Sequence, residues 1–296
     1  MSRYKFVIVD VFTTRPLTGN PLAVFPESDD LTEAQMQAIA REFNFSETTF
    51  IMRPREPKAN WRLRCFSPSA EVFGAGHNAL GAWWVIAELG IVPLNNGIET
   101  LWQELGDRIL PVEITANAGR PNRVAMTQSS PVFGGKLTDR TSLAQVIGLD
   151  VAELQVDGLE PQAVSTGATH LLTPVKSLGA LSRVRINPDK LIELVRPLGA
   201  QGCYLYSLET RESGSVAHSR AFFPGIGISE DPATGSAAGP LAAHLASKDL
   251  FKQNSWTIIE QGDEMGRPSR IEVRVNGDIV QVAGKSVKVA EGTLRL

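Results

Sequence analysis

The sequence is short of cysteine and of long apolar runs, and these two shortages exclude several classes of protein. Its 296 residues include 2 cysteines, too few for a disulfide-stabilised scaffold or a cysteine-based zinc cluster. No apolar stretch approaches the ~20 residues that a membrane-spanning helix requires. The first five residues lead directly into an apolar segment without the layout of a signal peptide. We therefore expect a cytoplasmic protein with no membrane partner.

An excess of charge of one sign is also lacking. Lysine and arginine number 29 against 32 aspartates and glutamates, for a net charge of −3. Proteins that bind nucleic acids usually carry a basic excess, so we expect no nucleic-acid partner. The 4 histidines show no metal-ligand spacing, and no glycine-rich phosphate-binding loop lies between a strand and a helix. We predict no metal and expect a small-molecule substrate.

Ordinary globular composition and local patterns indicate a mixed α/β chain of two domains. Hydrophobic residues make up 43% of the chain, and its length suggests two domains of ~150 residues each. Thr32 as an N-cap, with Gln35 three residues later, predicts a helix over 34–42. Strands are predicted at 6–12, 22–25, 48–52, 61–66, 163–173 and 203–207, a helix at 188–196, and a closing β-meander at 271–275, 279–282 and 286–289.

Two alanine-rich segments, 76–89 and 236–247, predict helices that are buried on nearly all sides. Each follows a similar turn: residues 71–77 and 230–236 both offer a carboxylate, small residues, and a glycine followed by a polar side chain. A chance likeness of two turns is the alternative. The phenylalanine-containing strand before each turn and the buried helix after it favour an internal duplication with two facing helix N-termini.

Two facing helix N-termini would form an anion site, because their unpaired backbone N–H groups and positive dipole ends converge. Gly76 and Gly235 permit close backbone approach, and Thr234 and Ser236 could add hydroxyl donors. The plainer alternative is that Ser236 only caps its helix and the glycines only serve the turns.

Three side chains are candidates for proton transfer. Glu47 lies between an apolar helix end and an apolar strand, where burial would disfavour its charged form and prepare it as a general acid or base. Alternatively it caps a helix or pairs with Arg53 or Arg55. His77, at the start of a duplicated helix, could exchange a proton near neutral pH, although a structural histidine is the commoner case. Asp231 could equally serve the turn that Pro232 begins.

The remaining thiols and imidazoles carry less information. Cys65 and Cys203 fall in predicted strands and outside both duplicated turns, so we interpret them as inert core residues. His244 lies deep in an alanine- and leucine-rich helix and is expected to serve packing.

Several segments, taken in order, resemble the PhzF-like (phenazine biosynthesis-like) isomerase family. They are Asp10-Val11-Phe12, Gly19-Asn20-Pro21-Leu22-Ala23-Val24-Phe25, Ser46-Glu47-Thr48-Thr49-Phe50, Ala75-Gly76-His77, the run from Glu230-Asp231-Pro232-Ala233-Thr234-Gly235-Ser236 to Leu241, the run from Gln261 to Pro268, and Glu291-Gly292-Thr293. They cover essentially the whole chain, and the run beginning at Glu230 is the most specific.

The resemblance implies the diaminopimelate epimerase-like α+β fold. Such a chain has two pseudo-symmetric domains, each a β-barrel-like sheet around a central helix, with the active site in the cleft between them. We accordingly expect an N-terminal domain of residues 1–122, completed by the last strand at about 284–296, and a C-terminal domain of 123–283. Members are commonly homodimers and need no cofactor.

The family's characterised chemistry is the isomerisation of a cyclic dihydro-hydroxyanthranilate by moving a proton along a conjugated system. By resemblance, Glu47 carries the proton, and His77 and Asp231 bind and orient the substrate, completing the catalytic set. The expected substrate-binding residues, including backbone N–H groups that would hold a substrate carboxylate, are Asn20, Gly76, Asn78, Thr234, Gly235 and Ser236. Asn78 stands where the family usually has proline, which leaves the natural substrate open.

Two other functions remain open on the sequence. One is an epimerase or racemase of a small amino or hydroxy acid, and the other is a catalytically idle small-molecule-binding protein on the same fold. Epimerases of this fold use two facing cysteines as acid and base. Neither Cys65 nor Cys203 lies in the turns where such thiols are needed, so that mechanism is disfavoured.

Overall fold

The computed structural model describes residues 2–74 and 76–296, so Ala75 of the Ala-Gly-His segment lies outside the described residues. The chain divides into unit 1, Met1–Thr127 with Ala283–Leu296, and unit 2, Gln128–Val282. The sequence had suggested changes of domain after residues 122 and 283. Over the described residues, no helix has both the length and the apolar character needed to cross a bilayer.

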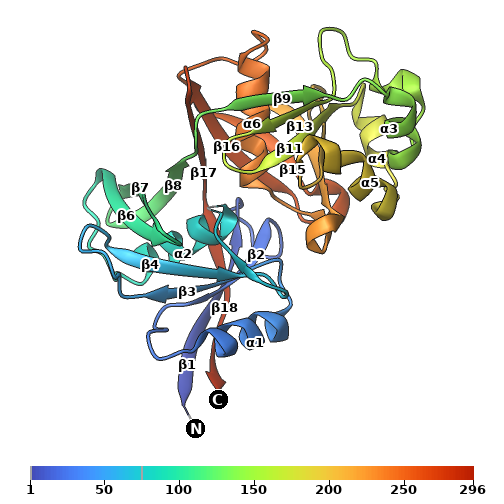
Figure 1. Cartoon of the computed structure of the whole chain (residues 1–296). Coiled ribbons are helices and arrows are strands. Elements are labelled where there is room, and N and C mark those ends of the chain that lie inside the picture. Colours follow the sequence, from blue (N-terminus) through green and yellow to red (C-terminus); the bar gives the residue numbers. More distant parts are fainter. Residues whose placement is uncertain (1, 75) are drawn as a thin grey trace. The chain divides into compact units, whose positions relative to one another are not determined.

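Unit 1 consists of strands paired both parallel and antiparallel, an outer helix and an inner helix (Figure 1). Its elements are β1 (Arg3–Val11), β2 (Asn20–Phe25), α1 (Glu33–Phe43), β3 (Thr48–Met52), β4 (Trp61–Phe66), β5 (Glu71–Val72), α2 (His77–Glu88), β6 (Gly97–Leu105), β7 (Arg108–Asn117), β8 (Arg120–Thr127) and β18 (Ser286–Arg295).

Unit 2 carries most of the helices, and α3, α4 and α5 gather on one side of it (Figure 1). Its elements are β9 (Val132–Lys136), α3 (Arg140–Ile147), η1 (Val151–Leu154), β10 (Gln162–Ser165), β11 (Thr169–Pro174), α4 (Leu178–Arg183), α5 (Pro188–Val195), η2 (Arg196–Leu198), β12 (Cys203–Ser207), β13 (Ser215–Phe223), η3 (Pro224–Ile226), β14 (Ile228–Asp231), α6 (Gly235–Ala246), β15 (Thr257–Gln261), η4 (Asp263–Met265) and β16 (Ser269–Asn276). Strand β17 (Ile279–Gly284) leads back to unit 1.

The two units repeat one sequence of strand pairings. In unit 1, β1–β2 is antiparallel, β2–β3 parallel, β3–β4 antiparallel, β4–β6 parallel and β6–β7 antiparallel. In unit 2, the same order of directions runs through β10–β11, β11–β12, β12–β13, β13–β15 and β15–β16. Each unit also places a short antiparallel strand, β5 or β14, just before its inner helix. The duplication inferred from two short turns is therefore confirmed at the level of topology.

The inner helices α2 and α6 are buried along almost their whole length, as their composition predicted. Helix α2 packs against β1, β2, β3, β4 and β8, and α6 packs against β10, β11 and β16. Small residues make this enclosure possible. A Cβ on Gly81 of α2 would lie 2.6 Å from Leu22 Cδ2, and one on Gly239 of α6 would lie 1.8 Å from Gln128 Oε1.

The outer helix α1 begins with the predicted capping box, in which the side chains of Thr32 and Gln35 each bond to the other's backbone. Its Met36, Ile39 and Ala40 pack on an aromatic cluster that includes Phe25 and Phe50. The helix ends at Asn44, whose φ of 52° reverses the chain. This ending leaves only a short connection, containing Ser46 and Glu47, before β3.

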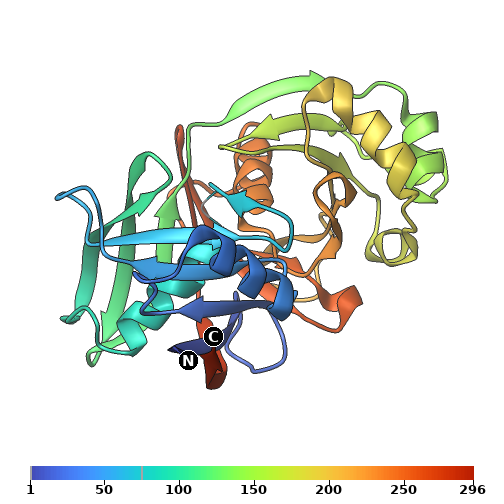
Figure 2. The ribbon, with the colours of Figure 1, turned by 60° about the horizontal axis from the view of Figure 1, so that its bottom comes forward.

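The last strand of the chain lies in unit 1. The three closing segments are strands, and the last of them, β18, pairs antiparallel with β1. The backbone N–H of Ser2 also donates to the Leu296 carbonyl at 2.8 Å. The two ends of the chain consequently lie side by side (Figure 2).

The loop between β1 and β2 requires glycine at one position. Gly19 has a φ of +68°, and a Cβ there would lie 2.4 Å from the Val11 carbonyl oxygen. The same loop is held from the other side, where Asp10 Oδ2 accepts a hydrogen bond from the backbone N–H of Leu17 at 2.6 Å. Asn20, the next residue, starts β2 and is fully buried.

Gly19→Ala is expected to lower the free energy of unfolding by more than about 2 kcal/mol, since a left-handed backbone costs an L-residue about 1–2 kcal/mol before any clash. Urea denaturation measures the change. Gly214→Ala is the matched control: Gly214 has no positive φ and open space around its Cβ position, so its effect should stay within about 1 kcal/mol. Equal effects of the two substitutions would contradict this account of the loop.

Candidate functional site

Two of the predicted catalytic residues lie together in unit 1. Glu47 comes from the connection before β3, and His77 is the first residue of α2. Glu47 Oε2 lies 3.8 Å from His77 Nδ1, and the two side chains are 16% and 9% exposed. The separation is too long for a hydrogen bond. A carboxylate and an imidazole therefore stand side by side with little water around them.

Ser46 connects His77 to Asn20. Its hydroxyl donates to Asn20 Oδ1 at 3.3 Å and lies 3.4 Å from His77 Nε2. A serine has one hydroxyl hydrogen, so a Ser46 that donates to Asn20 can only accept from His77. This network assigns the proton of the neutral ring to Nε2 and leaves the Nδ1 lone pair toward Glu47.

Burial lowers the pKa of His77 to about 4. The imidazole is thus neutral at neutral pH. His77 therefore does not exchange a proton near pH 7, although its residue type alone had suggested that it could. The alternative of a Glu47 ion pair with Arg53 or Arg55 finds no support. Arg53 bonds to Asp29 at 2.9 Å and Arg55 to Glu104 at 2.5 Å.

Asn78 caps the start of α2 with its own side chain. Its Oδ1 accepts from the backbone N–H groups of Gly76 and Ala79 at 2.7 Å each, and its Nδ2 donates to the Gly74 carbonyl at 3.0 Å. Proline, usual in the family at this place, could form none of these side-chain bonds. The Gly76 N–H, predicted to bind a substrate carboxylate, is therefore engaged by Asn78 and would have to be released first.

The predicted residues of unit 2 gather at the start of α6. Asp231 ends β14, Thr234 is the N-cap of α6, and both are more than 90% buried. The Thr234 hydroxyl donates to Asp231 Oδ2 at 2.5 Å. Because Thr234 holds the N-cap position, the alternative that Ser236 serves only as the N-cap is wrong. Gly235 and Ser236 occupy the first two helical positions, whose N–H groups have no acceptor inside the helix.

Sequence reasoning assigned no role to two residues that organise these groups. Ser46 links Asn20 and His77, and Gln261, fully buried at the end of β15, bonds to Asp231 and Thr234. Both fall within segments that carried the family resemblance, Ser46-Glu47-Thr48 and the run from Gln261. Their position in these segments was the one feature of the sequence that could have indicated a role for Ser46 and Gln261.

Both cysteines are core residues, as predicted. Cys65 in β4 and Cys203 in β12 have no exposed surface. Burial raises the pKa of both thiols, that of Cys203 to about 12 despite a hydrogen bond with Thr173. Neither thiol is a ready proton acceptor at neutral pH.

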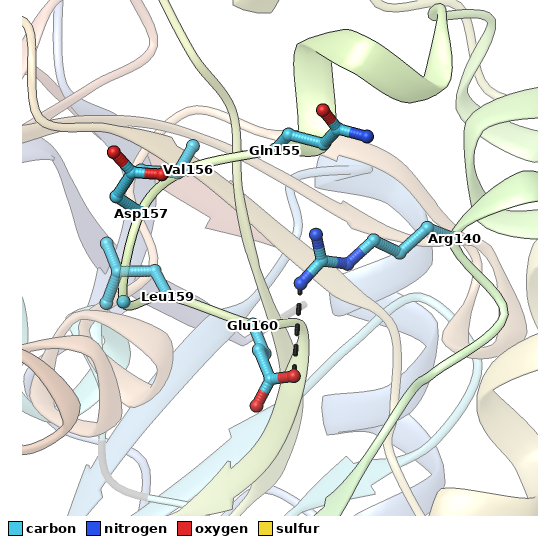
Figure 3. A pocket seen from close by; sticks show the side chains of 7 residues that line it. Arg140, Gln155, Val156, Asp157, Leu159 and Glu160 are labelled. Atoms are coloured by element: carbon cyan, nitrogen blue, oxygen red, sulfur yellow. Dashed lines mark ion pairs between the residues drawn. The ribbon is translucent and has the colours of Figure 1, made fainter.

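A surface pocket of about 410 Å³ in unit 2 is formed where α3 begins and by the segment around residues 155–160 (Figure 3). It is lined by Arg140, Gln155, Val156, Asp157, Gly158, Leu159 and Glu160, and a distance of 3.9 Å separates Arg140 Nη2 from Glu160 Oε1. None of its lining residues is a predicted site residue. Over residues 2–74 and 76–296, no group of three or more His, Cys, Asp or Glu is arranged to hold a metal ion.

Comparison with known proteins connects this geometry to one family. A family model described as "Phenazine biosynthesis-like protein" matches residues 9–292. The chain is 33% identical over 300 residues to trans-2,3-dihydro-3-hydroxyanthranilate isomerase of Pseudomonas aeruginosa, with 98% of each chain covered. It is 32% identical over 306 residues to an uncharacterized isomerase of Clostridium acetobutylicum, covering 99% of each.

Solved structures agree with the predicted fold class. A phenazine biosynthesis protein of the PhzF family from Bacillus anthracis matches with a TM-score of 0.90 and 29% identity over the full length of both chains. A hydroxyproline epimerase from Agrobacterium vitis matches with a TM-score of 0.64 over 99% of this chain and 92% of its own, at 11% identity, which bears on the fold alone. The predicted α+β, epimerase-like architecture is confirmed.

A buried charged cluster in unit 2 contrasts with His77. His218 Nδ1 lies 2.8 Å from Glu260 Oε2, and its Nε2 lies 3.1 Å from Glu264. Burial alone lowers the pKa of His218, but the hydrogen bonds to Glu264 and Glu260 outweigh it and raise the pKa above its usual value. Arg211 also contacts Glu264, at 3.1 Å.

The four histidines should separate in an NMR pH titration of the imidazole resonances. Burial lowers the pKa of His77, His170 and His244 to about 4. Their resonances should therefore stay constant between about pH 5 and 9, whereas His218 should titrate above its usual ~6.5. A His77 midpoint between pH 6 and 7 would contradict the neutral imidazole described here.

His218→Gln should remove a pH-dependent part of the stability. A raised pKa means that His218 stabilises the fold fully below about pH 6.5, and that this contribution is lost as the pH rises through the folded-state pKa. The substitution should lower the free energy of unfolding by about 3 kcal/mol at pH 6, since it removes the ring between the buried Glu260 and Glu264, of which only Glu264 keeps an arginine partner, Arg211. Urea denaturation at pH 6 and pH 9 should show a smaller loss at pH 9, and an equal loss at both would contradict the charge assignment.

Proposed function

Because the chain belongs to the phenazine biosynthesis-like family, we propose that it is a cofactor-independent isomerase that moves one proton within a small cyclic amino or hydroxy acid. The family and its named relatives make it an enzyme of the isomerase or epimerase type. The observation that carries the finer proposal is the pair of Glu47 and His77, a shielded carboxylate beside a neutral imidazole.

Glu47 carries the proton in this proposal. A single carboxylate can remove a proton from one carbon of a conjugated substrate and return it to another carbon on the same face. Such general acid–base catalysis contributes roughly 10²–10⁴ in rate. His77, neutral and held by Ser46, serves as a hydrogen-bonding partner for the substrate and does not compete with Glu47 as a base.

Substrate binding falls to the group at the start of α6. The Asp231 carboxylate accepts a hydrogen bond from a substrate amine or hydroxyl. The N–H groups of Gly235 and Ser236 have no acceptor within α6, and N–H groups at a helix N-terminus bind anions. They are therefore suited to bind a substrate carboxylate. We also propose that Asn20 and Asn78 contact the substrate. To do so, Asn78 would give up its hydrogen bonds with the backbone N–H groups of Gly76 and Ala79 and bond to the substrate instead.

The cysteines support a one-carboxylate mechanism over a two-thiol epimerisation. Cys65 and Cys203 are enclosed in strands β4 and β12 and are held protonated by burial. Two thiols that alternate as acid and base need access to a shared carbon and a thiolate on one of them. Glu47 meets the requirement of a proton carrier without either.

Glu47→Gln keeps the side-chain shape and removes the proton carrier. With trans-2,3-dihydro-3-hydroxyanthranilate in D₂O, followed by NMR and mass spectrometry, we expect the rate at which the variant converts the compound to be about 10²–10⁴-fold below that of the wild type. Glu71→Gln is the matched control, because Glu71 is a comparably shielded carboxylate of unit 1, 20% exposed, and bonded to Arg64. Its rate should remain close to that of the wild type.

Full turnover by the Glu47→Gln variant would end this proposal. A panel of cyclic and acyclic amino and hydroxy acids in the same medium separates the alternatives. Deuterium at a stereocentre with loss of optical activity would indicate an epimerase or racemase. Tight binding of a panel compound without any exchange over hours would indicate a binding protein that kept the fold.

A further inference from the structure

We propose that Gln261 is a positioning residue of this enzyme, holding the Asp231 carboxylate and the Thr234 hydroxyl in the orientation that receives substrate. The inference rests on the proposed function for what these two groups bind. Gln261 is the last residue of β15 and is fully buried, so its carboxamide must find all its partners within the protein. Four hydrogen bonds meet this requirement.

Two of these bonds are donated to the turn before α6. Gln261 Nε2 donates to the Asp231 carbonyl oxygen at 2.7 Å and to Thr234 Oγ1 at 3.0 Å. In return, Gln261 Oε1 accepts from the backbone N–H of Thr234 at 3.0 Å. One side chain therefore clamps both ends of the four-residue turn that begins at Asp231 and ends at the N-cap of α6.

The backbone partners fix the direction of the carboxamide. A carbonyl oxygen only accepts and a backbone N–H only donates, so the Gln261 nitrogen must face Asp231 and its oxygen must face the Thr234 N–H. With Nε2 donating to Thr234 Oγ1, the threonine's single hydroxyl hydrogen is directed to Asp231 Oδ2. The carboxylate is thereby set through two consecutive hydrogen bonds from Gln261.

Tyr204 supports the clamp from behind. Its hydroxyl donates to Gln261 Oε1 at 3.0 Å, and Ser219 Oγ lies 2.8 Å from that hydroxyl. Tyr204 is fully buried, and burial raises the pKa of its phenol, so it remains a donor at working pH. Strands β12, β13 and β15 each contribute one residue to this chain of bonds, which makes it part of the rigid sheet.

A carboxamide in this role has no near substitute. Glutamate has the same length but cannot donate to the Asp231 carbonyl, and it would place a second negative charge beside the Asp231 carboxylate. Methionine has a similar volume and no charge, but it leaves the Thr234 N–H and the Asp231 carbonyl without this partner. Gln261→Met therefore removes the clamp with the least change in packing.

The test compares Gln261→Met with Gln103→Met. Gln103 is also a fully buried glutamine on a strand, and it accepts from the Trp83 indole at 2.9 Å in unit 1. Both substitutions should lower stability, so stability alone does not separate them. Two further readouts do: NMR hydrogen exchange of the Thr234 amide, and kcat and KM on trans-2,3-dihydro-3-hydroxyanthranilate.

In Gln261→Met, we expect exchange of the Thr234 amide to accelerate about tenfold or more, and kcat/KM to fall about tenfold or more, chiefly through KM. In Gln103→Met, both quantities should stay within about twofold of the wild type once global stability is accounted for. Tyr204→Phe removes one of the two donors to Gln261 Oε1 and should produce an intermediate acceleration of exchange.

Unchanged Thr234 exchange in Gln261→Met would overturn the proposal, as would accelerated exchange with unchanged kcat/KM. Should that variant fail to fold, Tyr204→Phe decides, and an unaltered Thr234 amide in it would count against the clamp. A wild-type enzyme inactive on this compound and on the substrate panel would instead contradict the proposed function. Amide exchange would still decide whether Gln261 holds the turn.

Discussion

Each unit of this chain is built around one helix that is enclosed on nearly every side. Such packing holds the first turn of the helix in place as firmly as its middle. Helices α2 and α6 are so poor in polar residues that their sheets must close around them, and small residues such as Gly81 and Gly239 allow the close approach. Their first turns carry His77 in one unit and Gly235 and Ser236 in the other. Unpaired N–H groups at such buried ends require partners, and in α2 the side chain of Asn78 accepts from the N–H groups of Gly76 and Ala79.

In unit 1 a residue of the helix itself, Asn78, caps α2, whereas in unit 2 a residue distant in sequence, Gln261, holds the turn before α6. Features that depend on neighbouring residues could be predicted from the sequence, and those that depend on distant residues could not. The capping box of α1, the two buried helices and the duplication all follow from residues close in sequence. The cap that Asn78 forms over Gly76 is equally local, yet an asparagine at a helix start has several usual roles. Gln261 lies 27 residues from Thr234 and 57 from Tyr204. These residues are brought together by the antiparallel pairing of β12 with β13, the parallel pairing of β13 with β15 and the placement of β14 beside β13.

Burial also decides the chemistry that residue type alone leaves open. A histidine at a helix start could have been a proton carrier, and the absence of solvent makes His77 a neutral partner instead. The pKa of His218 is shifted in the opposite direction, because Glu260 and Glu264 lie against its ring. The thiols are held protonated in their strands. Among the groups that the resemblance assigned to catalysis in unit 1, Glu47 is the one whose carboxylate suits proton transfer.

The most direct test of this account is a crystal structure of the Glu47→Gln variant with trans-2,3-dihydro-3-hydroxyanthranilate bound, since a variant unable to move the proton should retain its substrate. The account predicts the carboxamide of the substituted residue within about 3–3.5 Å of a ring carbon of the compound. A compound bound away from residue 47, for example in the surface pocket lined by Arg140 and Glu160, would contradict it.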